Sequence, residues 1–297
     1  MDPFTVGLLV IFGLIVLLVL GVPISFALLL MGGLGVLLTS GMAGATFILS
    51  GLPYSSIGEL SLITIPLFLF MGHMAFSAGI TGRAFDTAKA WFGHISGGLP
   101  IATVFACAGF AAVCGSSIAT AATMAKITIP EMLKSGYGPK LAGATVAVAG
   151  TLGVLIPPSS IRVLYSIATQ APIADLFIAA IIPGILSAFI YAATIWFMVR
   201  MNPRTRAATA LPKATFEHRF TTLLHSWEIL LLFALVMVPL YFGIATATEA
   251  AAFGAGAALL ITMIRGTDRL KALKSGLLNT GSATATILLL VAGSALF

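Results

Sequence analysis

Charged residues are scarce in this chain: they make up 8% of its 297 residues, against roughly a quarter in an average soluble protein. Hydrophobic residues make up 59%. A soluble core cannot hide so many near-continuous apolar runs, so the composition excludes an ordinary soluble globular protein. We expect a lipid bilayer to cover most of the chain.

Cysteines and catalytic motifs are also scarce. Cys107 and Cys114 lie in apolar sequence, where a thiol behaves as a small hydrophobe, so we interpret both as packing residues. The sequence contains no Gly-Lys-Ser/Thr phosphate loop, no His-Glu-x-x-His motif and no nucleophile elbow. We therefore predict a protein that is not an enzyme, has no organic cofactor and hydrolyses no ATP.

The net charge of +6 does not indicate a nucleic-acid partner, because the basic residues are spread over connecting segments and are not interleaved with aromatic residues. The positive-inside rule accounts for them better. The N-terminus begins Met-Asp-Pro and enters an apolar stretch without a basic signal-peptide region, so we expect a retained membrane helix.

Long apolar runs recur along the chain. A membrane-spanning helix needs about 20 apolar residues to cross roughly 30 Å of hydrocarbon. Runs of this kind predict spans at residues 4–20, 24–49, 62–78, 173–199, 229–244, 247–264 and 277–297.

Two further apolar segments do not have the pattern of ordinary spans. The first, 99–132, has basic residues on both flanks, at Lys89 and Lys134, which places both of its ends in the cytoplasm and the N-terminus of the chain in the periplasm. This segment is then a re-entrant helical hairpin with its tip at 114–117. Two ordinary short helices are the alternative.

The second segment, 141–168, is interrupted by Pro157, Pro158, Ser159 and Ser160, so we predict one crossing made of two half-helices. The fold class is therefore an all-α polytopic membrane protein with a re-entrant hairpin and a broken helix. The predicted organisation has five parts: N-terminal scaffold helices with an interfacial helix (1–96), half of a transport domain (97–169), a returning helix (170–200), a cytoplasmic linker (201–226) and the incomplete start of a second repeat (227–297).

Both interruptions could carry chemistry. Non-helical backbone at membrane depth is tolerated only where protein buries it or where it lines a wet cavity. Freed carbonyl and hydroxyl oxygens suit a dehydrated Na⁺, while the N-termini of half-helices suit a carboxylate. The alternative is that these glycine, serine and proline residues only shape helix packing.

Four motifs occur in order along the chain: GSSIATAAT, IPEMLKSGYGP, AGTLGVLIPPSS and ATATEAAAFGA. Together they resemble the large membrane subunit of the tripartite ATP-independent periplasmic (TRAP) transporters. The resemblance implies inverted repeats of the ion-transporter superfamily, an elevator-like transport domain, a small four-helix membrane subunit and a periplasmic substrate-binding protein as partners. It also implies Na⁺-coupled import of a small organic acid, such as a C4-dicarboxylate or sialic acid, across the bacterial inner membrane.

The resemblance also assigns residues. Those that would border Na⁺ are Gly115, Ser116, Ser117, Gly150, Thr151 and Gly153. Those that would contact the substrate are Ser116, Ser117, Thr120, Pro157, Pro158, Ser159 and Arg162. A cation at Arg162 departs from the apolar residue of many relatives; it is either a counter-charge for a substrate carboxylate or an arginine that extends to the membrane surface.

Several alternatives stay open. Glu249 either caps a helix or takes part in ion coupling, and His73 is either a packing residue or a proton relay. The whole chain could instead be a single-polypeptide dicarboxylate symporter of the same superfamily, or a membrane scaffold that transports nothing.

In the TRAP family a second repeat supplies another hairpin and another Pro-Pro break, whereas this sequence stops at Phe297. We therefore expect no transport by this polypeptide alone. Proteoliposomes that hold only this chain should show no substrate uptake under an imposed Na⁺ gradient, and uptake above that of empty liposomes would contradict this expectation.

Overall fold

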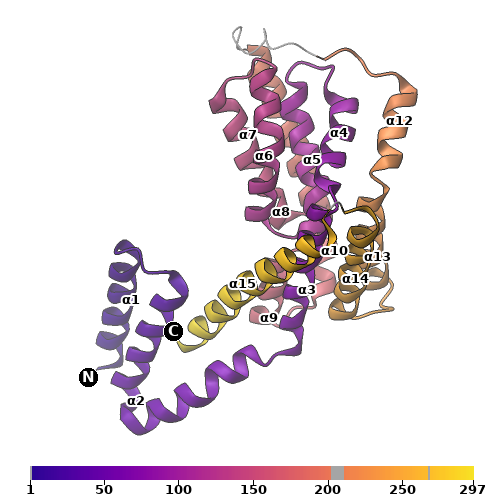
Figure 1. Ribbon diagram of the computed structural model, residues 1–297. Coiled ribbons are helices and arrows are strands. Elements are labelled where there is room, and N and C mark those ends of the chain that lie inside the picture. The colour runs from indigo at the N-terminus through magenta and orange to yellow at the C-terminus, as the bar shows by residue number, and fades with distance from the viewer. Residues whose placement is uncertain (1, 202–210, 267) are drawn as a thin grey trace. The chain divides into compact units, whose positions relative to one another are not determined.

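The computed structural model describes residues 2–201, 211–266 and 268–297, and it contains helices and no strand in these ranges. The chain forms two compact units (Figure 1). One unit contains residues 1–63 and 279–297, and the other contains residues 64–278.

The first unit is built from α1 (Pro3–Val19), α2 (Ile24–Ile57), the short 3₁₀ helix η1 (Leu60–Ile63) and the end of α15 (Arg269–Leu296). Helix α1 packs along α2. The C-terminal end of α15 crosses α2 closely, because a Cβ atom on Gly32 would lie 2.8 Å from the Leu296 backbone. Helix α2 bends at Gly41, whose φ of 67° is a left-handed conformation that glycine adopts without steric cost.

The second unit is built around α5 (Gly98–Cys114), which packs against seven other helices of this unit and has 14 of its 17 residues buried. Its other members are α3 (Thr64–Ser77), α4 (Ile80–Phe92), α6 (Ser117–Lys134), α7 (Pro139–Gly150), α8 (Leu152–Leu155), α9 (Ser160–Thr169), α10 (Ile173–Met201), α12 (Phe216–His225), α13 (Trp227–Tyr241), α14 (Ala247–Arg265) and the first residues of α15.

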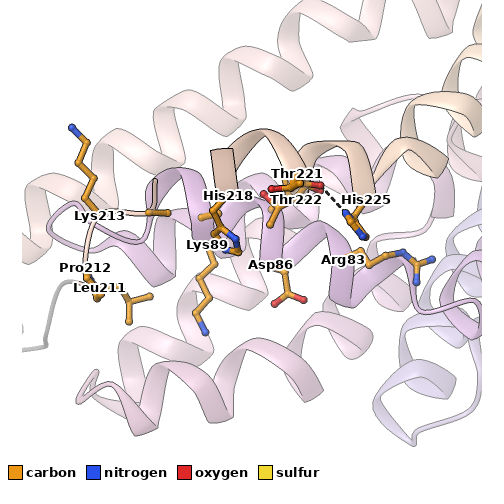
Figure 2. Close-up of a pocket in the computed structure, with 13 residues that line it drawn as sticks. Arg83, Asp86, Lys89, Leu211, Pro212, Lys213, His218, Thr221, Thr222 and His225 are labelled. Carbon is orange, nitrogen blue, oxygen red and sulfur yellow. Dashed lines mark hydrogen bonds between the residues drawn. The ribbon is translucent and has the colours of Figure 1, made fainter. Parts of the chain in front are cut away.

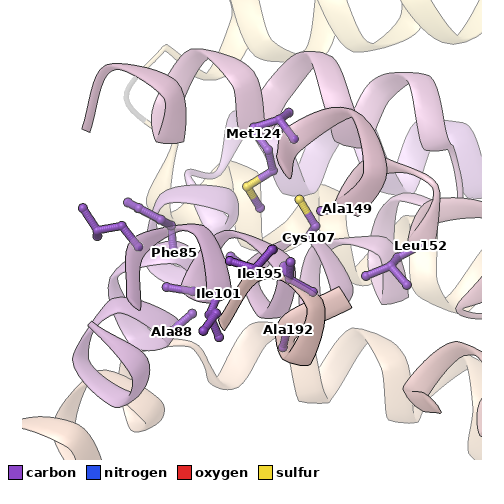
Figure 3. Packing of buried hydrophobic residues seen from close by; sticks show 14 of the residues in the cluster. Phe85, Ala88, Ile101, Cys107, Met124, Ala149, Leu152, Ala192 and Ile195 are labelled. Carbon is purple, nitrogen blue, oxygen red and sulfur yellow. The ribbon is translucent and has the colours of Figure 1, made fainter. Parts of the chain in front are cut away.

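A continuous hydrophobic cluster fills the second unit (Figure 3). It joins Phe85 of α4, Cys107 of α5, Met124 of α6, Leu152 of α8 and Ile195 of α10. Both cysteines are buried and unbridged, as predicted for packing residues. Because α5 is buried on nearly every face, its sequence is apolar or small throughout and shows no polar stripe.

The outer faces of the long helices are apolar as well. On α10, Ile182 is 76% exposed and Phe189 is 58% exposed, an arrangement that water would disfavour and lipid would not. Five described helices are long and apolar enough to span a bilayer, or seven if each of two bent pairs forms one span. The predicted class, an all-α polytopic membrane protein, is confirmed.

A helical hairpin and a broken helix appear at the predicted positions; that the hairpin is re-entrant stays a prediction. Helices α5 and α6 are joined by two non-helical residues, and α7–α8 is followed after a 44° bend by α9. The predicted linker contains a helix that we did not predict, α12 (Phe216–His225). Residues 202–210 of that linker lie outside the described residues. We divided the sequence into five parts by charge and motifs, whereas the two compact units are defined by packing. Packing places residues 64–96 in the same unit as the hairpin.

An ion-pair cluster ties three helices of the second unit together. The Glu228 carboxylate at the start of α13 is fully buried and lies 3.2 Å from the Arg83 guanidinium of α4. It also pairs with Arg265 of α14, whose guanidinium lies over the Trp227 ring. Sequence reasoning missed this cluster, because its members are 145 and 37 residues from Glu228.

We expect Glu228→Gln to destabilise the protein by about 3 kcal/mol. Removing one partner of a buried ion pair costs about 3–5 kcal/mol, and the partial exposure of both arginines favours the lower end of that range. The measurement is the thermal unfolding midpoint in detergent. The matched control is Glu217→Gln on exposed α12, and equal midpoints for the two variants would contradict a stabilising role for the cluster.

Candidate functional site

The tip of the α5–α6 hairpin is two residues long. Helix α5 ends at Cys114 and Gly115 adopts a left-handed conformation with φ 64°. Ser116 is extended, and its hydroxyl accepts a hydrogen bond from the Ala119 backbone N–H at 3.4 Å. This N-cap starts α6 directly after the turn.

The break in the second segment is of a different kind. Helix α8 ends at Leu155, after which Ile156 is extended and the Pro157–Pro158 peptide bond is cis. Prolines lack the N–H group that would continue the helical bonding pattern. The Arg162 guanidinium, one turn into α9, donates instead to the Leu155 carbonyl oxygen.

The tip and the break lie in direct contact. The Gly115 carbonyl oxygen accepts hydrogen bonds from the Ser160 backbone N–H at 3.2 Å and from the Ser160 hydroxyl at 3.0 Å. A Cβ atom on Gly115 would lie 2.7 Å from the Pro158 carbonyl oxygen, and one on Gly153 would lie 2.7 Å from the Ser116 carbonyl oxygen. Only glycine permits this approach of two backbones.

Four helix ends meet at this contact. The C-termini of α5 and α8 bring carbonyl oxygens and the negative ends of two helix dipoles. The N-termini of α6 and α9 bring free N–H groups and two positive ends. One small region therefore offers ligands for a cation beside ligands for an anion, as the crossing of broken helices does in secondary transporters.

Two buried hydroxyl groups at the contact have unused hydrogen-bonding capacity. Ser159 is fully buried, and its hydroxyl has no hydrogen-bond partner within the described ranges. Thr120 on α6 is also fully buried and without a hydrogen bond there, with the Cys114 thiol as a polar neighbour. Such a group costs about 1–3 kcal/mol if nothing binds it. Hydroxyl and carbonyl oxygens fit a hard cation such as Na⁺.

The other predicted residues are placed as follows. Gly150 packs against Ala121 of α6, where a Cβ atom would lie 2.6 Å from the alanine methyl group. The Thr151 hydroxyl donates to the Val148 carbonyl oxygen at 2.6 Å and lies 3.2 Å from the Tyr191 hydroxyl of α10. Its side chain is thus engaged with α7 and α10, and Tyr191 was not among the predicted residues.

Ser160 is the residue that sequence reasoning passed over. It belongs to the Pro-Pro-Ser-Ser motif, but no role was assigned to it beyond breaking the helix. A hydroxyl at the first position of a half-helix that follows two prolines was the available signal. Its partner, the Gly115 carbonyl oxygen, is 45 residues away and could not be deduced from spacing.

The surroundings of Arg162 bear on its two predicted roles, a counter-charge for a substrate carboxylate or an arginine that extends to the membrane surface. The side chain is partly buried, and its second terminal nitrogen, Nη1, is buried without a hydrogen-bond partner in the described structure.

Glu249 forms a complete capping box with Thr246 at the start of α14, which confirms the capping interpretation. No group of three or more His, Cys, Asp or Glu side chains that could hold a metal ion occurs among the described residues.

A helical hairpin packed against a broken helix inside an α-helical membrane protein is an arrangement found in secondary transporters. Residues 11–297 match the family described as the DctM component of the tripartite ATP-independent periplasmic transporters. The chain belongs to this family.

Similar proteins come from several bacteria. The chain is 36% identical over 238 residues to the C4-dicarboxylate TRAP transporter large permease protein DctM of Pseudomonas aeruginosa, covering 80% of this chain and 55% of that protein. It is 33% identical to DctM of Rhodobacter capsulatus, covering 97% and 68%. It is 31% identical to the sialic acid TRAP transporter large permease protein SiaM of Vibrio cholerae, covering 97% and 66%. The chain thus spans between about half and two thirds of the length of these relatives.

We expect Gly153→Ala to disrupt the contact between tip and break. The added methyl group would meet the Ser116 carbonyl oxygen at 2.7 Å, so the hairpin tip would have to move. The thermal unfolding midpoint in detergent should fall by several degrees. The control is Gly143→Ala on α7, where nothing lies within 4 Å and where alanine should add about 0.5–1 kcal/mol of helix stability. A similar change in both variants would contradict the close packing at Gly153.

Proposed function

We propose that this chain forms part of the large permease subunit of a TRAP transporter, and that the contact between the hairpin tip and the broken helix binds Na⁺ together with a small organic acid. The single observation that carries the proposal is the direct packing of the two breaks against each other. The Ser160 N–H and hydroxyl both donate hydrogen bonds to the Gly115 carbonyl oxygen.

The cation would take oxygen ligands from the C-terminal ends of α5 and α8, which directly precede the two breaks. Gly115, Ser116 and Gly153 border this region, and the unpartnered Ser159 and Thr120 hydroxyls are buried beside it. Gly150 brings α7 close to α6, and Ser117 starts α6. Thr151 acts through its contact with Tyr191, so we place it as a residue that positions α8 against α10.

The anion would face the N-termini of α6 and α9. A substrate carboxylate is favoured by their dipoles and free N–H groups. Arg162 supports this assignment, because its Nη1 is buried without a partner in the described structure while Nη2 holds the Leu155 carbonyl oxygen. Pro157 and Pro158 shape the same wall by keeping the backbone out of helical geometry.

The proposal extends to partners, location and substrate. Membership of this family leads us to expect two partners, a small membrane subunit and a periplasmic substrate-binding protein. The relatives named above are permeases for C4-dicarboxylates and sialic acid. We therefore propose import of a small organic acid across the bacterial inner membrane, with the N-terminus in the periplasm, as the distribution of basic residues indicates.

We expect Na⁺ to stabilise the purified chain against thermal unfolding and an equal concentration of K⁺ to have little effect. A ligand that binds only the folded state adds about 2.7 kcal/mol at a concentration one hundred times its Kd. The measurement is the unfolding midpoint in detergent across a Na⁺ titration at constant ionic strength.

The double variant Thr120→Val with Ser159→Ala should lose the Na⁺ response. The matched control is Thr128→Val, because Thr128 is also buried on α6 but its hydroxyl already donates to the Met124 carbonyl oxygen at 3.0 Å. A Na⁺ response that persists in the double variant would place the ion elsewhere, and equal responses to Na⁺ and K⁺ in the unaltered chain would oppose Na⁺ coupling altogether.

A further inference from the structure

A second candidate site lies between α4 and α12, away from the hairpin tip. These helices and residues 211–214 line an open pocket of about 740 Å³ (Figure 2). The walls are joined by hydrogen bonds: the Thr87 hydroxyl donates to the Thr222 carbonyl oxygen at 2.8 Å, and the Leu211 N–H donates to the Gly93 carbonyl oxygen at 3.0 Å. The pocket is therefore part of the fold of the second unit.

The lining of this pocket carries more basic than acidic residues. Its charged and titratable residues are Arg83, Lys89, Lys213, His218, His225 and Asp86. Two acidic residues outside the lining pair with two of these cations: Glu228 lies 3.2 Å from Arg83, and Glu131 lies 3.1 Å from Lys89. The side chains of Arg83 and Lys89 are nevertheless 25% and 31% exposed. Lys213 has no acidic partner in the parts of the chain that the structure describes. Burial raises the pKa of the Asp86 carboxyl, an effect that nearby Lys89 opposes and Glu131 reinforces.

An apolar groove of about 370 Å³ lies beside the basic pocket, and Thr87 lines both. The other residues of the groove are almost all apolar: Ala84, Ala88, Trp91, Phe92, Phe105, Gly109, Leu223, Ser226, Ile229 and Leu230. The arrangement follows from the pattern of α4, which presents its charged residues on one face and its alanine and aromatic residues on another.

We propose that the basic pocket and the apolar groove together bind one anionic phospholipid, with the phosphate headgroup in the pocket and an acyl chain in the groove. A free phosphate ion or a soluble organic acid would leave the groove unfilled, and an apolar helix of another protein would leave the basic pocket unmatched. A phospholipid uses both, and the charge complementarity selects an anionic one. Basic pockets beside membrane helices commonly bind such headgroups.

The surface of α12 fits the same environment. Phe216 is 79% exposed, and Phe220 and Leu224 are 54% and 56% exposed, on a helix that has no buried residue. Exposed aromatic and aliphatic side chains on an amphipathic helix are typical of the membrane interface. Trp91 links this helix to α4, because its indole N–H donates to the Arg219 carbonyl oxygen at 3.3 Å.

Trp91 supplies a direct test because it lines the groove and is one of three tryptophans. Replacing Trp196 and Trp227 with phenylalanine leaves it as the sole reporter. The purified full chain is reconstituted into phosphatidylcholine vesicles that contain increasing fractions of phosphatidylglycerol with brominated acyl chains, which quench nearby tryptophan. We expect half-maximal quenching at a much lower mole fraction than in the reverse experiment, with brominated phosphatidylcholine in phosphatidylglycerol vesicles.

Two variants test separately the contact with the lipid headgroup and the contact with the acyl chain. Lys89→Gln with Lys213→Gln should weaken the preference for phosphatidylglycerol by about fivefold for each charge removed. The matched control is Lys271→Gln with Lys274→Gln on α15, which makes the same change of charge outside the pocket and should keep the preference. Gly109→Leu should fill the groove and reduce quenching by both lipids.

Three results would overturn the proposal. Equal quenching by the two brominated lipids would mean that the groove takes any bilayer lipid. Absence of quenching by either would mean that lipid does not enter it. Reversal of the phosphatidylglycerol effect by millimolar inorganic phosphate, at an ionic strength held constant with chloride, would identify a phosphate-ion site instead. None of these results bears on the Na⁺ response, so this proposal and the transport proposal can fail separately.

Discussion

Backbone N–H and C=O groups have no water to bond with inside a bilayer, so a helix that breaks there must find its partners within the protein. In this chain two broken segments supply each other. The Gly115 carbonyl oxygen at the hairpin tip accepts from the N–H and hydroxyl of Ser160 at the second break. Gly115, Gly150 and Gly153 allow the necessary closeness. The four helix ends that meet there follow from this one constraint.

The same constraint separates two kinds of site along α5. Its C-terminal end carries the hairpin tip, where the candidate ligands are backbone and hydroxyl groups together with Arg162. Its N-terminal end follows α4 and lies near the bond between Gly93 and Leu211, beside the basic pocket. Seventeen residues of helix separate these ends, or roughly 25 Å. The candidate site at the tip thus relies on backbone and hydroxyl groups, whereas the pocket beside the other end of α5 is lined by several charged side chains.

Much of the candidate site could be predicted because its residues are local signals. A Gly-Ser-Ser run between two apolar segments predicts the end of one helix, and a Pro-Pro-Ser-Ser run inside a third segment predicts the end of another. Basic residues on both flanks of 99–132 then required a hairpin. By contrast, α12 was missed because residues 201–226 were interpreted only as a linker. The amphipathic pattern of Phe216–His225 is short, and this helix gains stability from packing on α4.

The sequence by itself determined the membrane class, most of the apolar spans and the positions of both breaks, because composition, periodicity and proline chemistry act over a few residues. Only the tertiary structure decided which groups meet. The pairing of Gly115 with Ser160 joins positions 45 residues apart, and Glu228 finds Arg83 across 145. Such partners are chosen by the packing of whole helices around α5, and no local pattern in the chain specifies that packing.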